Sequence, residues 1–282
     1  MTENIVRKPS WLKIKLPKGT NYTRVKSIVQ QHNLHTICTS GRCPNMGECW
    51  AAGTATLMIM GDICTRSCKF CATQTGKPLP LDRDEPVNVA KSIALMGLKH
   101  AVITSVDRDD LPDKGAGHWA KTITEIKRIN PQTTMEVLIP DFDGNALLIK
   151  QVIDARPEII SHNLETVKRL TPMVRSRAKY EVSLQVIQTI SGSGILSKSG
   201  IMVGLGETRD EILETMDDLL KVGCHVFTIG QYLQPAKSNL PVAEYIHPDV
   251  FEEYRHIGLA KGFKKVESAP LVRSSYHAER HL

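Results

Sequence analysis

Short apolar runs alternate with amphipathic segments along most of this chain. The first run, residues 54–60, is rich in strand-forming residues and is followed by Gly61-Asp62. Five later runs have the same character, so six strands are expected at residues 54–60, 101–104, 135–139, 159–162, 201–203 and 226–230. Strands that alternate with helices favour a parallel sheet, because right-handed crossovers place the helices outside it. This pattern fits both an open doubly wound sheet and a partial barrel.

The segments between these runs carry helix signals. Thr208 is the clearest helix start, since Glu211 three positions later completes a capping box. Pro86 is expected in the first turn of another helix, where its missing N–H costs nothing. The remaining helices are predicted at residues 21–33, 119–129, 146–155, 180–190 and 248–261.

Composition narrows the class of protein. The 282 residues are 41% hydrophobic and 23% charged, as in ordinary globular proteins, and no apolar run approaches the length of a membrane span. The polar start of the chain lacks the apolar core of a signal peptide. A formal net charge of +6 indicates acidic partners, but scattered Lys and Arg and 5% aromatic residues do not favour nucleic acid. We therefore expect neither a membrane nor a nucleic acid as partner.

Cysteine is the most informative residue type here. Six of the seven cysteines fall between Cys38 and Cys71, whereas a secreted disulfide framework would spread and pair them. This clustering predicts metal-binding thiols in a reducing cytoplasm. Cys224 stands alone where a strand begins, and we expect it to be a buried apolar side chain.

The second cysteine group has C-x3-C-x2-C spacing. Cys64, Cys68 and Cys71 can hold three irons of a cubane [4Fe-4S] cluster, because thiolate is its preferred ligand. The fourth iron would stay open to a small molecule. A structural zinc site needs four protein ligands, so this spacing fits zinc poorly.

The first cysteine group has C-x4-C-x5-C spacing. It consists of Cys38, Cys43 and Cys49. One zinc site that pools cysteines from both groups is an alternative, but six thiols exceed the four that it requires, so two clusters are the simpler account. His32 and His35 precede this group and are either additional ligands or inert solvent-facing side chains.

Cys64 to Cys71, with Phe70 before the last cysteine, resembles the signature loop of radical S-adenosylmethionine (SAM) enzymes. Both cysteine spacings together are similar to those of the lipoyl synthase family, as are the segments SVDRDDL, SHNLET, SGIMVGLGET and RSSY. The resemblance implies an α/β fold, a six-stranded partial (β/α)6 TIM-type barrel over residues 54–262. An N-terminal extension, residues 1–53, would carry the auxiliary cluster cysteines, and a tail, residues 263–282, would close on that cluster.

The resemblance also implies the site. Cys64, Cys68 and Cys71 would hold a [4Fe-4S] cluster whose open iron binds SAM. Polar residues collect after the expected strands, at the end of a barrel where chemistry occurs, and the residues expected to bind SAM are Phe70, Ser105, Asp107, Asn163 and Glu165. The auxiliary [4Fe-4S] cluster would be held by Cys38, Cys43, Cys49 and Ser275, with Ser274 as the alternative serine.

The activity implied by the resemblance is insertion of two sulfurs, at carbons 6 and 8 of an octanoyl chain on a lysine of a lipoyl carrier domain. That carrier would be a dehydrogenase E2 or a glycine cleavage H-type protein, and flavodoxin or ferredoxin would supply electrons. Two other classes of function remain open: a zinc-stabilised nucleic-acid-binding protein and an iron–sulfur electron carrier without catalysis. Within the radical SAM enzymes, a biotin-synthase-like or methylthio-transferring enzyme is the nearest alternative.

Overall fold

The computed structural model describes residues 8–12, 20–32, 34–51 and 54–282, so parts of the predicted extension 1–53 lie outside the described residues. The six expected strands are all present as parallel neighbours of one sheet. They are β2 (Thr56–Ile59), β5 (His100–Ser105), β6 (Thr134–Leu138), β7 (Ile159–Ser161), β8 (Leu196–Val203) and β9 (Val226–Gln231).

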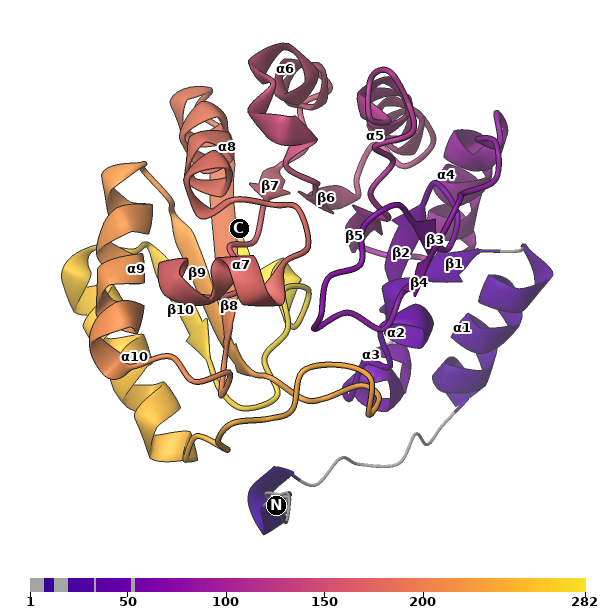
Figure 1. The fold of residues 1–282 in the computed structure, drawn as a ribbon. Coiled ribbons are helices and arrows are strands. Elements are labelled where there is room, and N and C mark those ends of the chain that lie inside the picture. Colours follow the sequence, from indigo (N-terminus) through magenta and orange to yellow (C-terminus); the bar gives the residue numbers. More distant parts are fainter. Residues whose placement is uncertain (1–7, 13–19, 33, 52–53) are drawn as a thin grey trace.

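Strand order distinguishes the two architectures that the sequence left open. The sheet runs β1-β2-β5-β6-β7-β8-β9-β10, in chain order and without reversal. A doubly wound sheet reverses its strand order at a switch point, so this order is that of a barrel wound in one direction. Figure 1 shows the strands curving around a central space with the helices outside.

Two edge strands were not expected from the sequence. β1 (His35–Thr36) pairs antiparallel with β2, and β10 (Lys265–Ser268) pairs parallel with β9. The predicted tail 263–282 therefore begins with a strand of the sheet. β8 also starts five residues before its predicted start at position 201. The apolar pattern did not indicate this part of the strand, because Ser197, Lys198 and Ser199 are polar yet completely buried.

The outer helices match their predicted positions closely. Thr208 accepts a hydrogen bond from the Glu211 N–H at 3.3 Å while its own N–H donates to the Glu211 carboxylate at 2.8 Å, which confirms the capping box. The outer helices are α4 (Glu85–Met96), α5 (Ala116–Ile129), α6 (Ala146–Asp154), α8 (Tyr180–Gly192), α9 (Arg209–Lys221) and α10 (Pro248–Lys261). The other helices are α1 (Thr20–Gln31), α2 (Ile37–Ser40), α3 (Met46–Ala51) and α7 (Thr171–Val174), with 3-10 turns η1 (Ser10–Leu12), η2 (Phe142–Gly144), η3 (Lys168–Leu170) and η4 (Ala278–His281).

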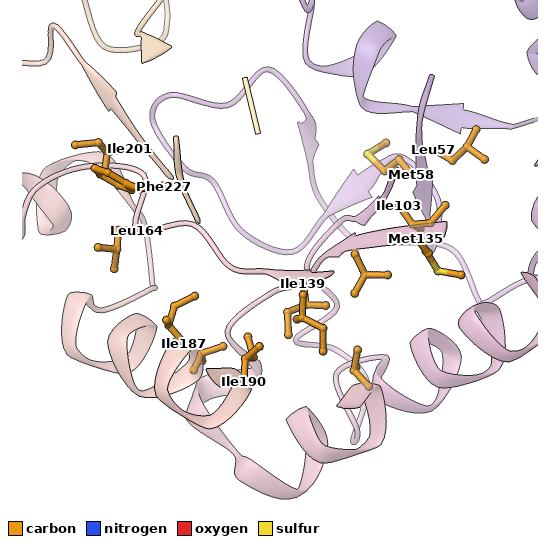
Figure 2. Close-up of a cluster of buried hydrophobic side chains, with 14 of the residues drawn as sticks. Leu57, Met58, Ile103, Met135, Ile139, Leu164, Ile187, Ile190, Ile201 and Phe227 are labelled. Carbon is orange, nitrogen blue, oxygen red and sulfur yellow. The ribbon is translucent and has the colours of Figure 1, made fainter. Parts of the chain in front are cut away.

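The main apolar core lies between the strands and their covering helices. Ile103 and Met135 extend from the sheet, and Ile187 and Ile190 from α8, all completely buried (Figure 2). Burying one such side chain contributes roughly 1.5–3 kcal/mol, so this layer holds the strand ends in fixed positions. Among the described residues no helix is long and apolar enough to cross a membrane.

Candidate active site

The C-x3-C-x2-C loop is fastened to the barrel on several sides. Its ends pair as β3 (Ile63–Cys64) and β4 (Gln74–Thr75), two short parallel strands. The Thr65 N–H donates to the Asp107 carbonyl at 3.1 Å, and the Lys69 N–H donates to the Val174 carbonyl at 2.9 Å. The loop therefore rests on the segments that follow β5 and on α7, above the carboxyl ends of the strands.

Each thiol of this loop has a polar neighbour. Cys64 Sγ accepts the N–H groups of Arg66 and Asp107 at 3.4 and 3.3 Å, and Cys71 Sγ accepts the Thr73 N–H at 3.4 Å. Burial raises the pKa of Cys64 to about 12, and the Asp107 carboxylate acts in the same direction. Without a metal this thiol is protonated at neutral pH, so binding iron would displace its proton.

Arg66 locks the loop in place. Its buried guanidinium donates to Asp109 and Asp141, each at 2.8 Å, which follow β5 and β6. Hydrogen bonding from Arg66 lowers the pKa of Asp109 to about 2. Asp110 is paired with Arg108 at 2.9 Å. The acidic run after β5 is thus paired with arginines. The sequence offered no signal for Arg66 beyond a cation between two cysteines.

One cavity of about 500 Å³ is lined by all but one of the predicted site residues. The cysteines that line it come from both groups: Cys38, Cys43, Cys64, Cys68 and Cys71. The other predicted residues in its lining are Phe70, Ser105, Asp107, Asn163, Glu165, Ser274 and Ser275. Cys49 lies outside this lining, on α3, where its thiol is within electrostatic reach of Cys43 and Cys38.

The tail returns to the first cysteine group. Asn45 Nδ2 donates to the Leu271 carbonyl at 2.7 Å, and the Tyr276 hydroxyl donates to the Glu48 carboxylate at 3.3 Å. These contacts place the turn 273–276 beside Cys43, and with it the two serines.

Two buried polar atoms of the cavity have no partner in the described part of the chain: Ser105 Oγ and Asn163 Oδ1. A buried oxygen without a hydrogen bond costs free energy that a bound ligand would recover. The cavity volume also lies in the range of small-molecule sites. A polar cofactor such as SAM therefore fits this lining. Burial raises the pKa of the nearby Glu165 carboxyl, which Arg175 opposes.

The described residues contain no three His, Cys, Asp or Glu side chains gathered around a single-ion site. The ligands of a cubane cluster lie farther apart than those of a single ion, because each thiolate binds a different iron. His32 and His35 line a separate cavity of about 330 Å³ and not the one that the cysteines share. Cys224 is buried and donates to the Val226 carbonyl, in agreement with its predicted role as a buried side chain.

Solved structures share this fold at low sequence identity. Methylornithine synthase aligns with a TM-score of 0.56 at 11% identity, covering 91% of this chain and 85% of that chain. Streptococcus suis SuiB bound to S-adenosylmethionine aligns with a TM-score of 0.58 at 11% identity, covering 80% of this chain and 54% of that chain. These likenesses confirm the TIM-barrel-like α/β fold.

Sequence relatives are far more similar. Residues 58–219 match the radical SAM superfamily, and residues 2–43 match the N-terminal domain of lipoyl synthase. Lipoyl synthase of Parabacteroides distasonis is 68% identical over 98% of this chain and 99% of that protein, and that of Treponema denticola is 62% identical over 98% and 95%. The chain therefore belongs to the lipoyl synthase family of radical SAM enzymes.

Proposed function

We propose that this enzyme inserts sulfur at carbons 6 and 8 of an octanoyl chain, with two [4Fe-4S] clusters that face one cavity. The observation that carries the proposal is the shared lining of that cavity. Cysteines of both groups and the 273–276 turn border the same space of about 500 Å³. A substrate chain that enters it can meet a radical source and a sulfur source without leaving.

Cys64, Cys68 and Cys71 are assigned to the SAM-binding cluster. When bound, this cluster and SAM supply the electron and the radical that break C–H bonds too weakly acidic for a positioned base. Ser105 and Asn163 would satisfy their unpartnered oxygens on SAM, and Phe70, Asp107 and Glu165 complete its surroundings. Buried Arg66 keeps the three thiols in one place through its pairs with Asp109 and Asp141.

Cys38, Cys43, Cys49 and Ser275 are assigned to the auxiliary cluster. Ser274 Oγ already accepts a 2.6 Å hydrogen bond from Asn163, which supports its neighbour Ser275 as the ligand. A serine oxygen is a hard ligand, whereas iron in such clusters prefers thiolate. The iron at Ser275 would therefore be held weakly, which suits a cluster that gives up its sulfide.

The walls of the cavity favour radical chemistry in other ways. Apolar side chains from several strands line it, among them Met58, Val102, Leu138 and Ile201. They receive an alkyl chain and exclude water, which limits side reactions of a reactive intermediate.

The macromolecular substrate is a lipoyl carrier domain. We assign this role to a dehydrogenase E2 or glycine cleavage H-type protein, with flavodoxin or ferredoxin as electron donor, in a cytoplasm that keeps the thiols reduced. The net charge of +6 supports acidic partners. Carrier binding should then weaken as salt is raised, because exposed charges are screened over about 8–10 Å at moderate ionic strength.

The test is an anaerobic turnover experiment. The reconstituted protein is analysed for iron, sulfide and zinc, then mixed with SAM, a strong reductant and an octanoylated carrier peptide. Mass spectrometry should show the peptide gaining one and then two sulfurs. Zinc without iron would favour a zinc-binding protein, SAM cleavage without sulfur gain would exclude sulfur insertion on this carrier, and gain of a methylthio group would move the chain to that class.

A further inference from the structure

A completely buried lysine, Lys198, contacts the turn 273–276. Lys198 on β8 and Glu136 on β6 both have side chains with 0% exposure, and the ammonium lies 2.8 and 2.9 Å from the two carboxylate oxygens. Lys198 Nζ also donates to the Ser274 carbonyl and to Nδ1 of His281, the latter at 3.1 Å. An ammonium group has three N–H donors, and here all three have acceptors.

Three residues accept hydrogen bonds from Lys198, and two of them, Ser274 and His281, belong to the tail. Ser274 is adjacent to Ser275, and His281 lies in η4 with its side chain fully buried. Glu136 accepts a further hydrogen bond from Ser161 of β7 at 2.7 Å. The network therefore connects β6, β7 and β8 to the tail, through groups that would be costly to bury alone. Figure 1 shows the C-terminal end within the ring of strands.

The serine ligand needs such support for a chemical reason. A weak iron–oxygen bond cannot by itself order a turn whose residues lose conformational freedom when fixed. The turn must therefore be held by other contacts before the ligand atom can be in position. Lys198 is the buried charge that reaches the carbonyl next to Ser275.

We infer that Lys198, paired with Glu136, is the positioning residue that orients the 273–276 turn so that Ser275 faces the auxiliary cysteines. This inference rests on the proposed function for the role of Ser275. The anchoring of the tail, in contrast, is measurable whether or not Ser275 binds iron.

The experiment is hydrogen exchange on the reconstituted holoenzyme, read by mass spectrometry over residues 271–282. The main variant is Lys198→Met with Glu136→Gln, which removes both charges together and leaves neither buried without its partner. Its tail should exchange about tenfold faster or more, because contacts to a charged donor are lost. A ferric or ferrous chelator should also withdraw iron from the auxiliary cluster faster. Exchange in α4, α5 and α9 should not change.

Two further variants keep the test decisive if the double variant does not fold. His281→Phe removes one tail acceptor and leaves the Lys198–Glu136 pair intact, and its tail should exchange several-fold faster. Lys127→Met is the matched control, since Lys127 on α5 forms a half-exposed pair with Glu158 and makes no hydrogen bond or ion pair with the described tail. Its tail should keep the exchange rate of the unmodified enzyme.

Ser275→Ala separates this inference from the proposed function. Its tail should stay protected, because Lys198 rather than the cluster holds the turn. Loss of protection in Ser275→Ala equal to that of the double variant would show that the cluster orders the tail and would overturn the inference. So would unchanged protection in His281→Phe together with a folded double variant. Full sulfur insertion by Ser275→Ala would instead remove the ligand role while leaving the anchor in place.

Discussion

Asn163 donates a 2.6 Å hydrogen bond to the hydroxyl of Ser274, which lies 111 residues later in the chain. Asn163 follows β7, and its other amide atom, Oδ1, is buried at the cavity without a partner among the residues that the structure describes. Ser274 belongs to the turn beside Cys43. The two sides of the cavity, one assigned to SAM and one to the auxiliary cluster, therefore share a hydrogen bond.

The two serines should behave differently when substituted. Ser275→Ala is expected to retain SAM cleavage and lose the lipoyl product. Ser275→Cys should assemble its clusters, because thiolate binds iron more firmly, yet release sulfide less readily and give less product. Ser274→Ala loses only the bond from Asn163, worth about 1 kcal/mol, and should be milder. Iron content, 5′-deoxyadenosine and lipoyl peptide are measured together. Complete turnover by Ser275→Ala would mean that another residue is the fourth ligand.

Substitutions in the two cysteine groups should also have different effects on SAM cleavage and sulfur insertion. Cys68→Ala removes a thiol assigned to the SAM-binding cluster and is expected to abolish SAM cleavage. Cys43→Ala should leave SAM cleavage measurable and stop sulfur insertion. The measurement is 5′-deoxyadenosine production, with spectroscopy to show that the unaltered cluster is intact. Equal loss of cleavage in both variants, each with its other cluster present, would contradict the assignment.

Gly230 leaves room for the tail. A Cβ added there would overlap the main-chain oxygen of Val272, so Gly230→Ala must displace the segment that leads to the serines. Overpacking of this kind costs about 1–3 kcal/mol. Lipoyl product should fall about tenfold or more. Gly192→Ala is the control, because its added methyl meets no atom within 4 Å. Product formation and thermal melting are compared, and an unimpaired Gly230→Ala enzyme would show that the tail has another route to the cysteines.

His162 should make stability depend on pH. Burial lowers the pKa of this imidazole from 6.5 to about 4. Nδ1–H donates to the Ile139 carbonyl and Nε2 accepts from the Ser183 hydroxyl, both at 2.9 Å, so the folded protein holds the neutral form. The unfolded chain then binds the proton more readily. The neutral His162 side chain therefore contributes to the free energy of unfolding. This contribution is complete above pH 6.5 and is lost as pH falls toward 4, by about 3 kcal/mol in all.

Chemical denaturation at pH 7 and pH 5 checks this prediction. His162→Gln cannot titrate, and its amide can still donate and accept. Its free energy of unfolding should therefore fall less between the two pH values than that of the unmodified protein. An identical fall in both proteins would assign the pH dependence to other groups.

The strands and outer helices could be predicted because their periodicity follows directly from burial. β8 was predicted short, because a strand that buries Ser197, Lys198 and Ser199 does not read as apolar. The candidate cysteine ligands could also be predicted, because the cysteines of each group lie close together in the sequence. The partners of Arg66 and of Lys198 could not be predicted, since Asp141 and His281 come from distant parts of the chain and meet only in the folded barrel.

The contact between Asn45 and Leu271 joins residues 226 positions apart. A ribosome that adds about 5–20 residues per second needs roughly 10–50 s to synthesise the intervening chain. By the end of that interval the cysteines of both groups have been synthesised, whereas the turn 273–276 has not. Completion of the site assigned to the auxiliary cluster is thus a late event in synthesis, and the newly made thiols depend on a reducing environment until it occurs.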